Sequence, residues 1–403
     1  MLGKHNHNVK SFSKRYSMPM MKEIEPIETE PWMLDPCLTY LNHGSFGARA
    51  ASVFDYQIAL KHELASSPVD FLDRQRGRLR EARTTVAKFL GVERERFGFV
   101  DNATTGVGCV VNSIRFSARD EILTTSHVYN GVRQLLKRTA SDAGCTYREI
   151  SINLPVHCSD ELLEAVQREI TTSTKLLVVD HVSSSTSIIF PIEEIVRFCK
   201  EKGVLVLVDG AHAPGMIELD IDSIGADWYV GNLHKWVCAP LGAGFICTAE
   251  KHSLSTHPMT VSHNLGLGFE SEFEWQGTKD ITPWLTSAKA VEWGNALGWQ
   301  RINKHNHELA TWMHRTLIEE WKVDPLLPID GSMFGNMATV RLPHWCPKTL
   351  ETCLDFRDQI FKKYKIEVPF FELQGFGAVR ISAQLYSRET HLRRLISAIS
   401  DFS

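Results

Sequence analysis

Lys235 is the side chain whose surroundings most strongly suggest reactivity. It follows the segment Asp227-Trp-Tyr-Val-Gly-Asn-Leu-His234 and precedes Trp236, an apolar setting in which lysine is rare. Loss of solvation lowers the pKa of an ammonium group, so a lysine placed there presents the neutral amine that forms an imine with an aldehyde. A lone lysine at a strand end more often extends its ammonium group to water. The catalytic interpretation therefore depends on companion residues.

Asp209 is the first companion. It ends the apolar run 204–209 and precedes a turn of small residues, 210–215. In open parallel sheets, ligands bind beyond the carboxyl ends of the strands, where this turn would leave room. A buried carboxylate needs a cation, and a protonated pyridine nitrogen would supply one. An aspartate before a turn serves equally well as a helix N-cap, so both interpretations stay open for Asp209 alone.

An anion site is the second companion. Residues 101–108 carry small and hydroxyl side chains between the apolar run 97–100 and a predicted helix, and orphan amides at a helix N-terminus bind phosphate. Val111 replaces the third glycine of a dinucleotide-binding motif, and no Gly-Lys-Ser/Thr follows as in a P-loop. His127 ends a further predicted strand, where it is suited either to stack on a cofactor ring or to lie near the surface.

The elements that must position these residues alternate between helical patterns and short apolar runs. This rhythm predicts an α/β fold with a mainly parallel central sheet and helices on both faces. The runs 175–180 and 204–209 are apolar throughout, as in strands buried on both faces, and each ends in an aspartate. Residues 286–322 predict a long helical segment interrupted near Gly298, and a smaller α+β domain follows. The predicted strands are 97–100, 121–125, 175–180, 204–209, 228–230 and 244–247, then 337–342, 366–369 and 378–382 in the smaller domain.

Composition favours a small-molecule ligand. The 403 residues carry a formal net charge of −4, which gives no reason to expect nucleic acid or a membrane surface as a partner. No apolar run approaches the roughly 20 residues that span a bilayer. The nine cysteines are scattered without a CxxC pair, which favours a reducing, cytoplasmic location and argues against structural zinc; no metal site is expected. Residues 1–22 hold basic but no acidic residues, and we interpret them as a disordered tail rather than an organellar targeting segment.

Six motifs in order resemble the class V aminotransferase family. The resemblance is nearest to its isopenicillin N epimerase-like branch, which also holds cysteine desulfhydrases and other C–S lyases, and it runs from about residue 32 to the C-terminus. The motifs are Leu41-Asn-His-Gly-Ser-Phe-Gly47, Asp101-Asn-Ala-Thr-Thr-Gly106, Thr125-Ser-His-Val-Tyr-Asn130, Asp209-Gly-Ala-His212, Gly231-Asn-Leu-His-Lys-Trp236 and Val379-Arg-Ile-Ser382.

The resemblance implies a pyridoxal-5′-phosphate (PLP) enzyme of fold type I. It implies four domain segments: an N-terminal extension 1–30, an N-terminal part of the small domain 31–55, a large PLP-binding domain 56–295 and a small domain 296–403. It also implies a homodimer with shared active sites, in which the Gln276-Gly277-Thr278 loop reaches the phosphate bound by the neighbouring subunit.

The same resemblance assigns roles to individual residues. Lys235 would carry the cofactor as a Schiff base and act as the general base. Asp209 would pair with the pyridine nitrogen, with His212 beside it, and His127 would stack on the ring. The phosphate would be bound by Thr104, Thr105, His234 and, from the neighbouring subunit, Thr278. Arg380 would bind the substrate α-carboxylate, a task suited to a bidentate guanidinium, and Asn42 and His43 would line the substrate side.

The reaction is less well determined than the family. The leading hypothesis is an isopenicillin N epimerase-like enzyme acting at the α-carbon of an amino acid or small peptide with free amino and carboxylate groups. The alternatives are a cysteine desulfhydrase or other C–S lyase, and an aminotransferase. Cys346 and Cys353 do not lie in a pattern typical of the mobile persulfide loop of cysteine desulfurases, so persulfide formation is not expected.

Overall fold

A seven-stranded sheet forms the centre of the molecule in the computed structural model, which describes residues 24–403. The predicted tail 1–22 lies outside the described residues. The strand order is β2-β8-β7-β6-β5-β3-β4; β8 runs antiparallel to both its neighbours, and the strands from β7 to β4 are parallel. The strands are β2 (Phe97–Val100), β3 (Glu121–Thr125), β4 (Thr146–Ile150), β5 (Thr174–Asp180), β6 (Leu205–Gly210), β7 (Trp228–Asn232) and β8 (Gly244–Thr248).

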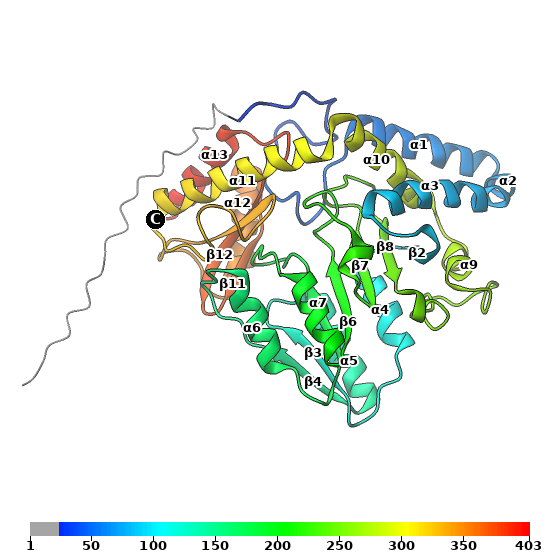
Figure 1. The fold of residues 1–403 in the computed structure, drawn as a ribbon. Helices are drawn as coiled ribbons and strands as arrows, with labels where there is room; N and C mark the ends of the chain where they lie inside the picture. The colour runs from blue at the N-terminus through cyan, green and yellow to red at the C-terminus, as the bar shows by residue number, and fades with distance from the viewer. Residues whose placement is uncertain (1–23) are drawn as a thin grey trace, which may run out of the picture.

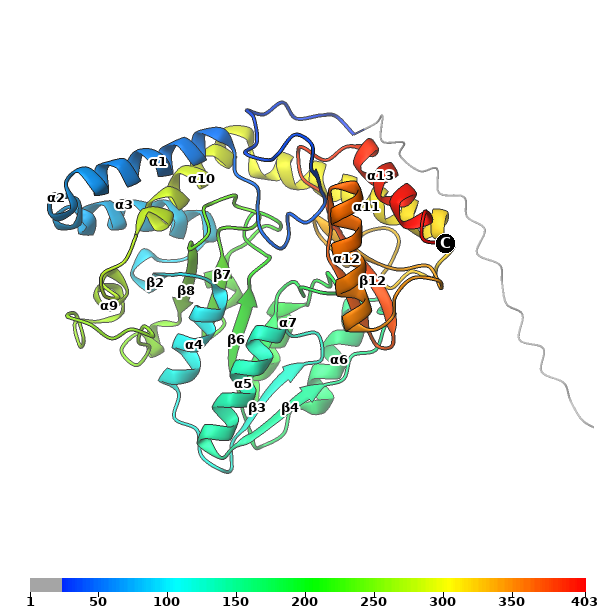
Figure 2. The same ribbon diagram turned by 180° about the vertical axis from the view of Figure 1, so that it is seen from behind.

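Helices cover both faces of this sheet (Figures 1 and 2). In β6, Val206 and Val208 join one apolar cluster, whereas Leu207 between them joins a second cluster on the other face. The continuous apolar pattern of this strand therefore reflects burial on both faces, as predicted. The helices are α4 (Ala103–Ser113) and α5 (Asn130–Ala143) on one face, α6 (Ser159–Glu169) and α7 (Ile192–Glu201) on the other, and the short α8 (Ile221–Ile224).

A smaller antiparallel sheet, ordered β11-β12-β9, follows later in the chain. The N-terminal segment reaches this region, because β1 pairs in parallel with β10. Helices α11 to α13 lie against this part of the molecule (Figure 2). The elements are β1 (Thr39–Tyr40), β9 (Met337–Arg341), β10 (Ile366–Glu367), β11 (Phe370–Leu373), β12 (Phe376–Ser382), α11 (Trp299–Trp321), α12 (Leu350–Tyr364) and α13 (Glu389–Ser400).

A layer of helices lies beside β2 and β8 and leads into the smaller sheet. Helix α10 packs on α1 and α3, and Gly298, with a φ of 85°, separates α10 from α11, which confirms the predicted interruption. None of the helices within 24–403 has both the length and the apolar character needed to cross a bilayer. The remaining elements are α1 (Ala51–Ser66), α2 (Pro68–Asp73), α3 (Gln75–Leu90), α9 (Phe269–Glu274), α10 (Thr282–Leu297) and the 3-10 turns η2 (Arg94–Arg96) and η3 (Glu250–His252).

The predicted strands are all present, with ends that differ by at most two residues, and three further strands appear within residues 24–403: β1, β4 and β11. β4 was missed because its sequence, Thr-Tyr-Arg-Glu-Ile, is half polar, as befits a strand at the sheet edge. β11 was missed because only one of its four residues is fully buried. The domain boundaries at residues 30, 55 and 295 remain predictions.

Candidate active site

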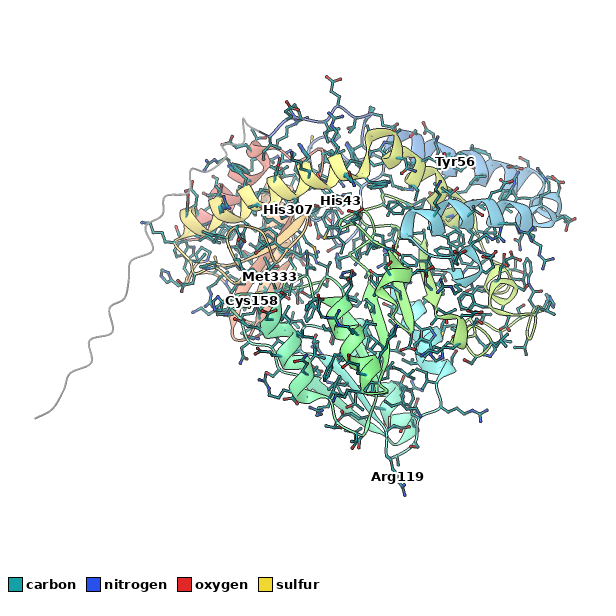
Figure 3. All side chains as sticks on the ribbon, in the orientation of Figure 1. His43, Tyr56, Arg119, Cys158, His307 and Met333 are labelled. Atoms are coloured by element: carbon teal, nitrogen blue, oxygen red, sulfur yellow. The ribbon has the colours of Figure 1, made fainter. Side chains whose placement is uncertain are left out.

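A cavity of about 790 Å³ opens at the carboxyl ends of the central strands. Figure 3 shows the two ends of the sheet: Arg119, which precedes β3, projects from the amino end, and His43 lies near the opposite end. Six residues that the sequence assigned to the cofactor site line this one cavity: Thr104, Thr105, Asp209, His212, His234 and Lys235.

Lys235 lies in the tight loop that follows β7. Its Nζ is 3.0 Å from Nε2 of His212, and its carbonyl accepts a hydrogen bond from the amide of Cys238, which has a left-handed φ of 64°. Burial, followed by the positive charge of Arg380, lowers the pKa of Lys235 to about 7. The lysine therefore presents an appreciable fraction of neutral amine at neutral pH, as its apolar setting predicted.

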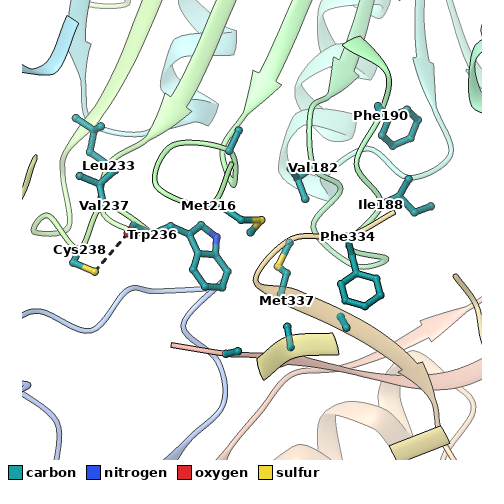
Figure 4. Packing of buried hydrophobic residues seen from close by; sticks show 14 of the residues in the cluster. Val182, Ile188, Phe190, Met216, Leu233, Trp236, Val237, Cys238, Phe334 and Met337 are labelled. Carbon is teal, nitrogen blue, oxygen red and sulfur yellow. Dashed lines mark hydrogen bonds between the residues drawn. The ribbon is translucent and has the colours of Figure 1, made fainter. Parts of the chain in front are cut away.

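The loop that carries Lys235 rests on apolar packing. Trp236 is 1% exposed, and Figure 4 shows it close to Met216 and Met337, in the cluster between the central sheet and β9. On the outer side, the amide of Gly47 donates to the carbonyl of His234 at 2.9 Å. The loop that carries the lysine is thus held by apolar packing on one side and by a backbone hydrogen bond on the other.

Two aspartates end neighbouring strands at the cavity wall. Asp209 ends the apolar part of β6, is 2% exposed, and its Oδ1 accepts from the amide of Ala211 at 2.9 Å. Burial raises the pKa of this carboxyl group, and Lys235 acts in the opposite direction. Asp180, at the end of β5, lies directly beside it in the sheet register. The sequence marked Asp180 as a strand-end aspartate but gave it no role.

The N-terminus of α4 faces the cavity through Thr104 and Thr105. Asn102 caps this helix, with its side chain accepting from the amide of Thr105 at 2.9 Å, and Asn232 accepts from the amide of Ala103 at 2.8 Å. The first-turn amides and the helix dipole make this terminus suitable for a phosphate. His234 lies nearby; burial lowers its pKa to about 4, so it is neutral at physiological pH.

Arg380, on β12, is buried behind the cavity wall and does not itself line the cavity. Its guanidinium donates to the hydroxyl of Ser45 at 2.7 Å, to Oδ1 of Asn42 at 3.3 Å and to the carbonyl of Ser184 at 2.5 Å. Ser45 and Ser184 both line the cavity. Arg380 is therefore separated from the cavity by a single layer of small polar side chains.

Four other predicted residues lie away from the cavity lining: Asn42, described above beside Arg380, and also His127, His43 and Thr278. His127 is buried, with Nδ1 2.8 Å from the Thr186 hydroxyl and Nε2 3.0 Å from the carbonyl of Ile152. His43 is fully buried; burial lowers its pKa to about 3, and its Nδ1 lies 3.0 Å from the Tyr386 hydroxyl. Thr278 is exposed outside the cavity. The cavity instead includes Tyr129, which is 49% exposed and which belongs to the motif 125–130 but was assigned no role.

The two cysteines that were considered for persulfide chemistry are buried away from this cavity. Cys346 is 6% exposed and Cys353 is fully buried on α12. Burial raises the pKa of both thiols, which disfavours the nucleophilic thiolate. That neither cysteine carries a persulfide remains a prediction.

Comparison with known proteins identifies the family. Residues 60–361 match the aminotransferase class V family. The isopenicillin N epimerase of Amycolatopsis lactamdurans is 32% identical over 390 residues, which cover 92% of this chain and 96% of that protein. An L-cysteine desulfhydrase of Arabidopsis thaliana is 28% identical over 396 residues, which cover 90% of this chain and 87% of that protein.

Solved structures give the same result for the fold. The cystine C–S lyase C-DES, solved with cysteine persulfide, has a TM-score of 0.77 at 19% identity, over 91% of this chain and 98% of that one. Another structure of C-DES holds glycine covalently linked to its PLP cofactor. The predicted fold type I is thereby confirmed. The chain belongs to the class V aminotransferase family of PLP-dependent enzymes, as its six motifs predicted.

Proposed function

We propose that this enzyme acts at the α-carbon of an amino acid or small peptide with free amino and carboxylate groups, as an isopenicillin N epimerase-like enzyme. The observation that carries the proposal is the state of Arg380. Its guanidinium is 1% exposed, forms no ion pair with any carboxylate within residues 24–403, and its Nε has no hydrogen-bond partner there. A buried cation without a counter-ion is costly, so the site is suited to an anionic ligand.

The cavity fits PLP. Lys235 offers the amine for its aldehyde, Asp209 a carboxylate for its ring nitrogen, and the α4 terminus an anion site for its phosphate. When bound, PLP withdraws electrons from the substrate α-carbon and so acidifies the α-proton. The role of His127 as the group that stacks on the ring remains part of the proposal.

The roles of the protein groups follow from their positions. Arg380 would bind the substrate carboxylate once Ser45 and Ser184 make room, with Asn42 orienting the guanidinium. The Lys235 amine would take the α-proton, and His212, 3.0 Å away, would hold that amine in place. His43 would support the wall behind the substrate rather than contact the substrate.

The fate of the α-carbon separates the candidate reactions. Return of a proton to the opposite face of the α-carbon is epimerisation, loss of a β-thiol is C–S lysis, and exchange of the amino group for a keto group is transamination. The 32% identity to isopenicillin N epimerases supports the first, and the 28% identity to L-cysteine desulfhydrases keeps the second as the alternative.

Incubation with a panel of amino acids and peptides in deuterated buffer tests this proposal. We expect deuterium at the α-carbon of one substrate without release of pyruvate. Pyruvate and sulfide from cysteine would instead establish the lyase. With a second keto acid supplied to accept the amino group, conversion of the substrate to its keto acid with no α-deuteration would establish the aminotransferase. Borohydride reduction of the PLP-loaded enzyme is the matched control, because it should leave a phosphopyridoxyl group on Lys235 whichever reaction follows.

We further infer a homodimer in which Thr278 contributes to the neighbouring phosphate site. Five large apolar side chains between η3 and α9 are at least half exposed, which is unusual for a surface that remains in water. They precede the Gln276-Gly277-Thr278 loop, in which Thr278 is exposed. The apolar residues between η3 and α9 are Leu254, Met259, Val261, Leu265 and Leu267.

We also propose a reducing, cytoplasmic location, which the nine free cysteines support.

A further inference from the structure

Asp180 is a second buried carboxyl group in the active cavity that the roles above leave unused. It is the last residue of β5, is 3% exposed, and lines the cavity together with Asp209 and Lys235. Asp180 and Asp209 are register partners on adjacent parallel strands, whose backbones lie roughly 4.8 Å apart. Their side chains therefore leave the same edge of the sheet as neighbours.

The hydrogen-bonding capacity of Asp180 is incompletely used. Its Oδ2 is buried and has no partner within residues 24–403, and no lysine, arginine or histidine there forms an ion pair with it. The groups that face it are Asp209 from β6, Lys235 from the loop after β7, and the backbone amide of Tyr129 before α5. The amine of Lys235 is already engaged with His212.

Two adjacent buried carboxyl groups cannot both carry a full charge, so one of them holds a proton. Both carboxyl groups accept a backbone amide, that of Ala211 for Asp209 and that of Tyr129 for Asp180, but among residues 24–403 only Asp180 of the two has a buried oxygen without a partner, so Asp209 is the better site for the charge. Burial, and then repulsion from Asp209, raise the pKa of Asp180 well above its ordinary value. The proton at neutral pH therefore belongs to Asp180, whose Oδ2 lacks a hydrogen-bond partner in the described part of the chain.

We propose that Asp180 is a protonated carboxylic acid of the active cavity, whose O–H group donates a hydrogen bond to an acceptor atom of bound PLP. This inference rests on the PLP site proposed above. It assigns the cofactor rather than the substrate as the acceptor, because Asp180 lies beside Asp209, the residue suited to the ring nitrogen. A neutral donor here adds a contact to the ring without adding a second negative charge.

Infrared spectroscopy of the PLP-free full-length protein tests the protonation state independently of catalysis. At neutral pH we expect the C=O stretching band of a protonated carboxylic acid, and we expect Asp180→Asn to abolish it. Asp101→Asn is the matched control: Asp101 also lines the cavity, but its side chain is half exposed and paired with Lys279, so the band should persist. A band that is absent in the wild type, or that survives in D180N, would overturn the proposal.

PLP titrations, followed by visible absorption, test the hydrogen bond. Asparagine keeps a donor at this position and leucine removes it, so D180N should bind PLP within about threefold of the wild type, whereas D180L should lose about tenfold or more. Circular dichroism checks that both variants are folded. If D180L is not folded, the PLP affinity of D180N alone shows whether Asp180 acts as a neutral acid or as an anion. A large loss of PLP affinity in D180N would mean that Asp180 acts as an anion. Unchanged PLP affinity in folded D180L would show that Asp180 donates no hydrogen bond to PLP. Either result contradicts the proposal. Failure of the wild type to bind PLP would instead refute the cofactor site itself, while the infrared band would still report on Asp180.

Discussion

At the scale of the residue, the chemistry depends on ionisable side chains that are buried without enough opposite charge and hydrogen bonds around them. Burial is the main cause of the shifted pKa values of Lys235, Arg380, Asp180 and Asp209. The positive charge of Arg380 adds to the shift of Lys235, and the negative charge of Asp209 adds to that of Asp180, which is how an enzyme holds an amine and a carboxylic acid neutral near pH 7. The site is thus prepared to take up an anionic, aldehyde-bearing molecule.

The pH dependence of imine formation by Lys235 is the prediction at this scale. Only the neutral amine attacks an aldehyde, so the rate at which the PLP-free protein takes up PLP should rise with pH through a midpoint of about 7. Arg380→Met removes a neighbouring cation and should move that midpoint to higher pH. Stopped-flow absorbance at a series of pH values measures both. The exposed Arg119→Met is the control and should leave the midpoint in place; a wild-type midpoint near 10, as for an ordinary lysine, would show that burial does not activate this amine.

At the scale of the element, the arm between β1 and α1 holds the lysine loop from outside. Gly47 is suited to this place because of close approach rather than backbone conformation: a Cβ atom there would lie 2.1 Å from the carbonyl oxygen of Lys235 and 2.8 Å from that of His234. Both obstructing atoms belong to the backbone and cannot rotate away. The same arm supplies Asn42 and Ser45 to Arg380, so its position is coupled to both ends of the site.

Substitution of Gly47 tests this coupling. Gly47→Ala should destabilise the protein by about 1–3 kcal/mol through overpacking and should weaken PLP binding, because the arm and the lysine loop must separate. Gly77→Ala provides the contrast: Gly77 lies exposed in α3, and a methyl group added there would have no atom within 4 Å, so alanine should stabilise the helix by about 0.5–1 kcal/mol. Denaturant unfolding and PLP titration measure the two effects. Equal stability of G47A and the wild type would disprove the close contact.

At the scale of the whole molecule, the segment between η3 and α9 projects beside β2 at one end of the structure (Figure 1). Its exposed leucines and the neighbouring Thr278 loop are suited to a second copy of the chain, which would bury the apolar side chains and complete the phosphate site. A surface of this kind in a monomer would instead favour aggregation.

Charge placed on this segment tests the dimer. Leu265→Glu should convert a particle of twice 45.6 kDa into one of 45.6 kDa in sedimentation velocity, with reduced PLP affinity, because a buried unpaired carboxylate opposes association. Leu350→Glu on α12 is the matched control, since Leu350 is 61% exposed and Leu265 is 59% exposed. A wild-type protein that sediments as a monomer, or an L265E variant that remains dimeric, would contradict the proposed assembly.

The sequence by itself determined the features that depend on one element and its immediate neighbours in the chain. Apolar runs identified β5 and β6 because both faces of these strands are buried, and small residues after β2 identified the start of α4 because a helix terminus leaves its amides free. Lys235 and Asp209 stood out for the same local reason, and the structure places them in one cavity.

Only the tertiary structure decided how distant segments meet. Contacts between residues far apart in the chain set the antiparallel direction of β8, the pairing of Asp180 with Asp209 and the position of His43 behind the cavity wall. They also leave Arg380 without a carboxylate partner among the residues from 24 onwards. The physical reason is that a local pattern records whether a side chain is buried, but not against what. Strand order and long-range packing select those partners, and with them the pKa values and open hydrogen-bonding positions on which the chemistry of this site depends.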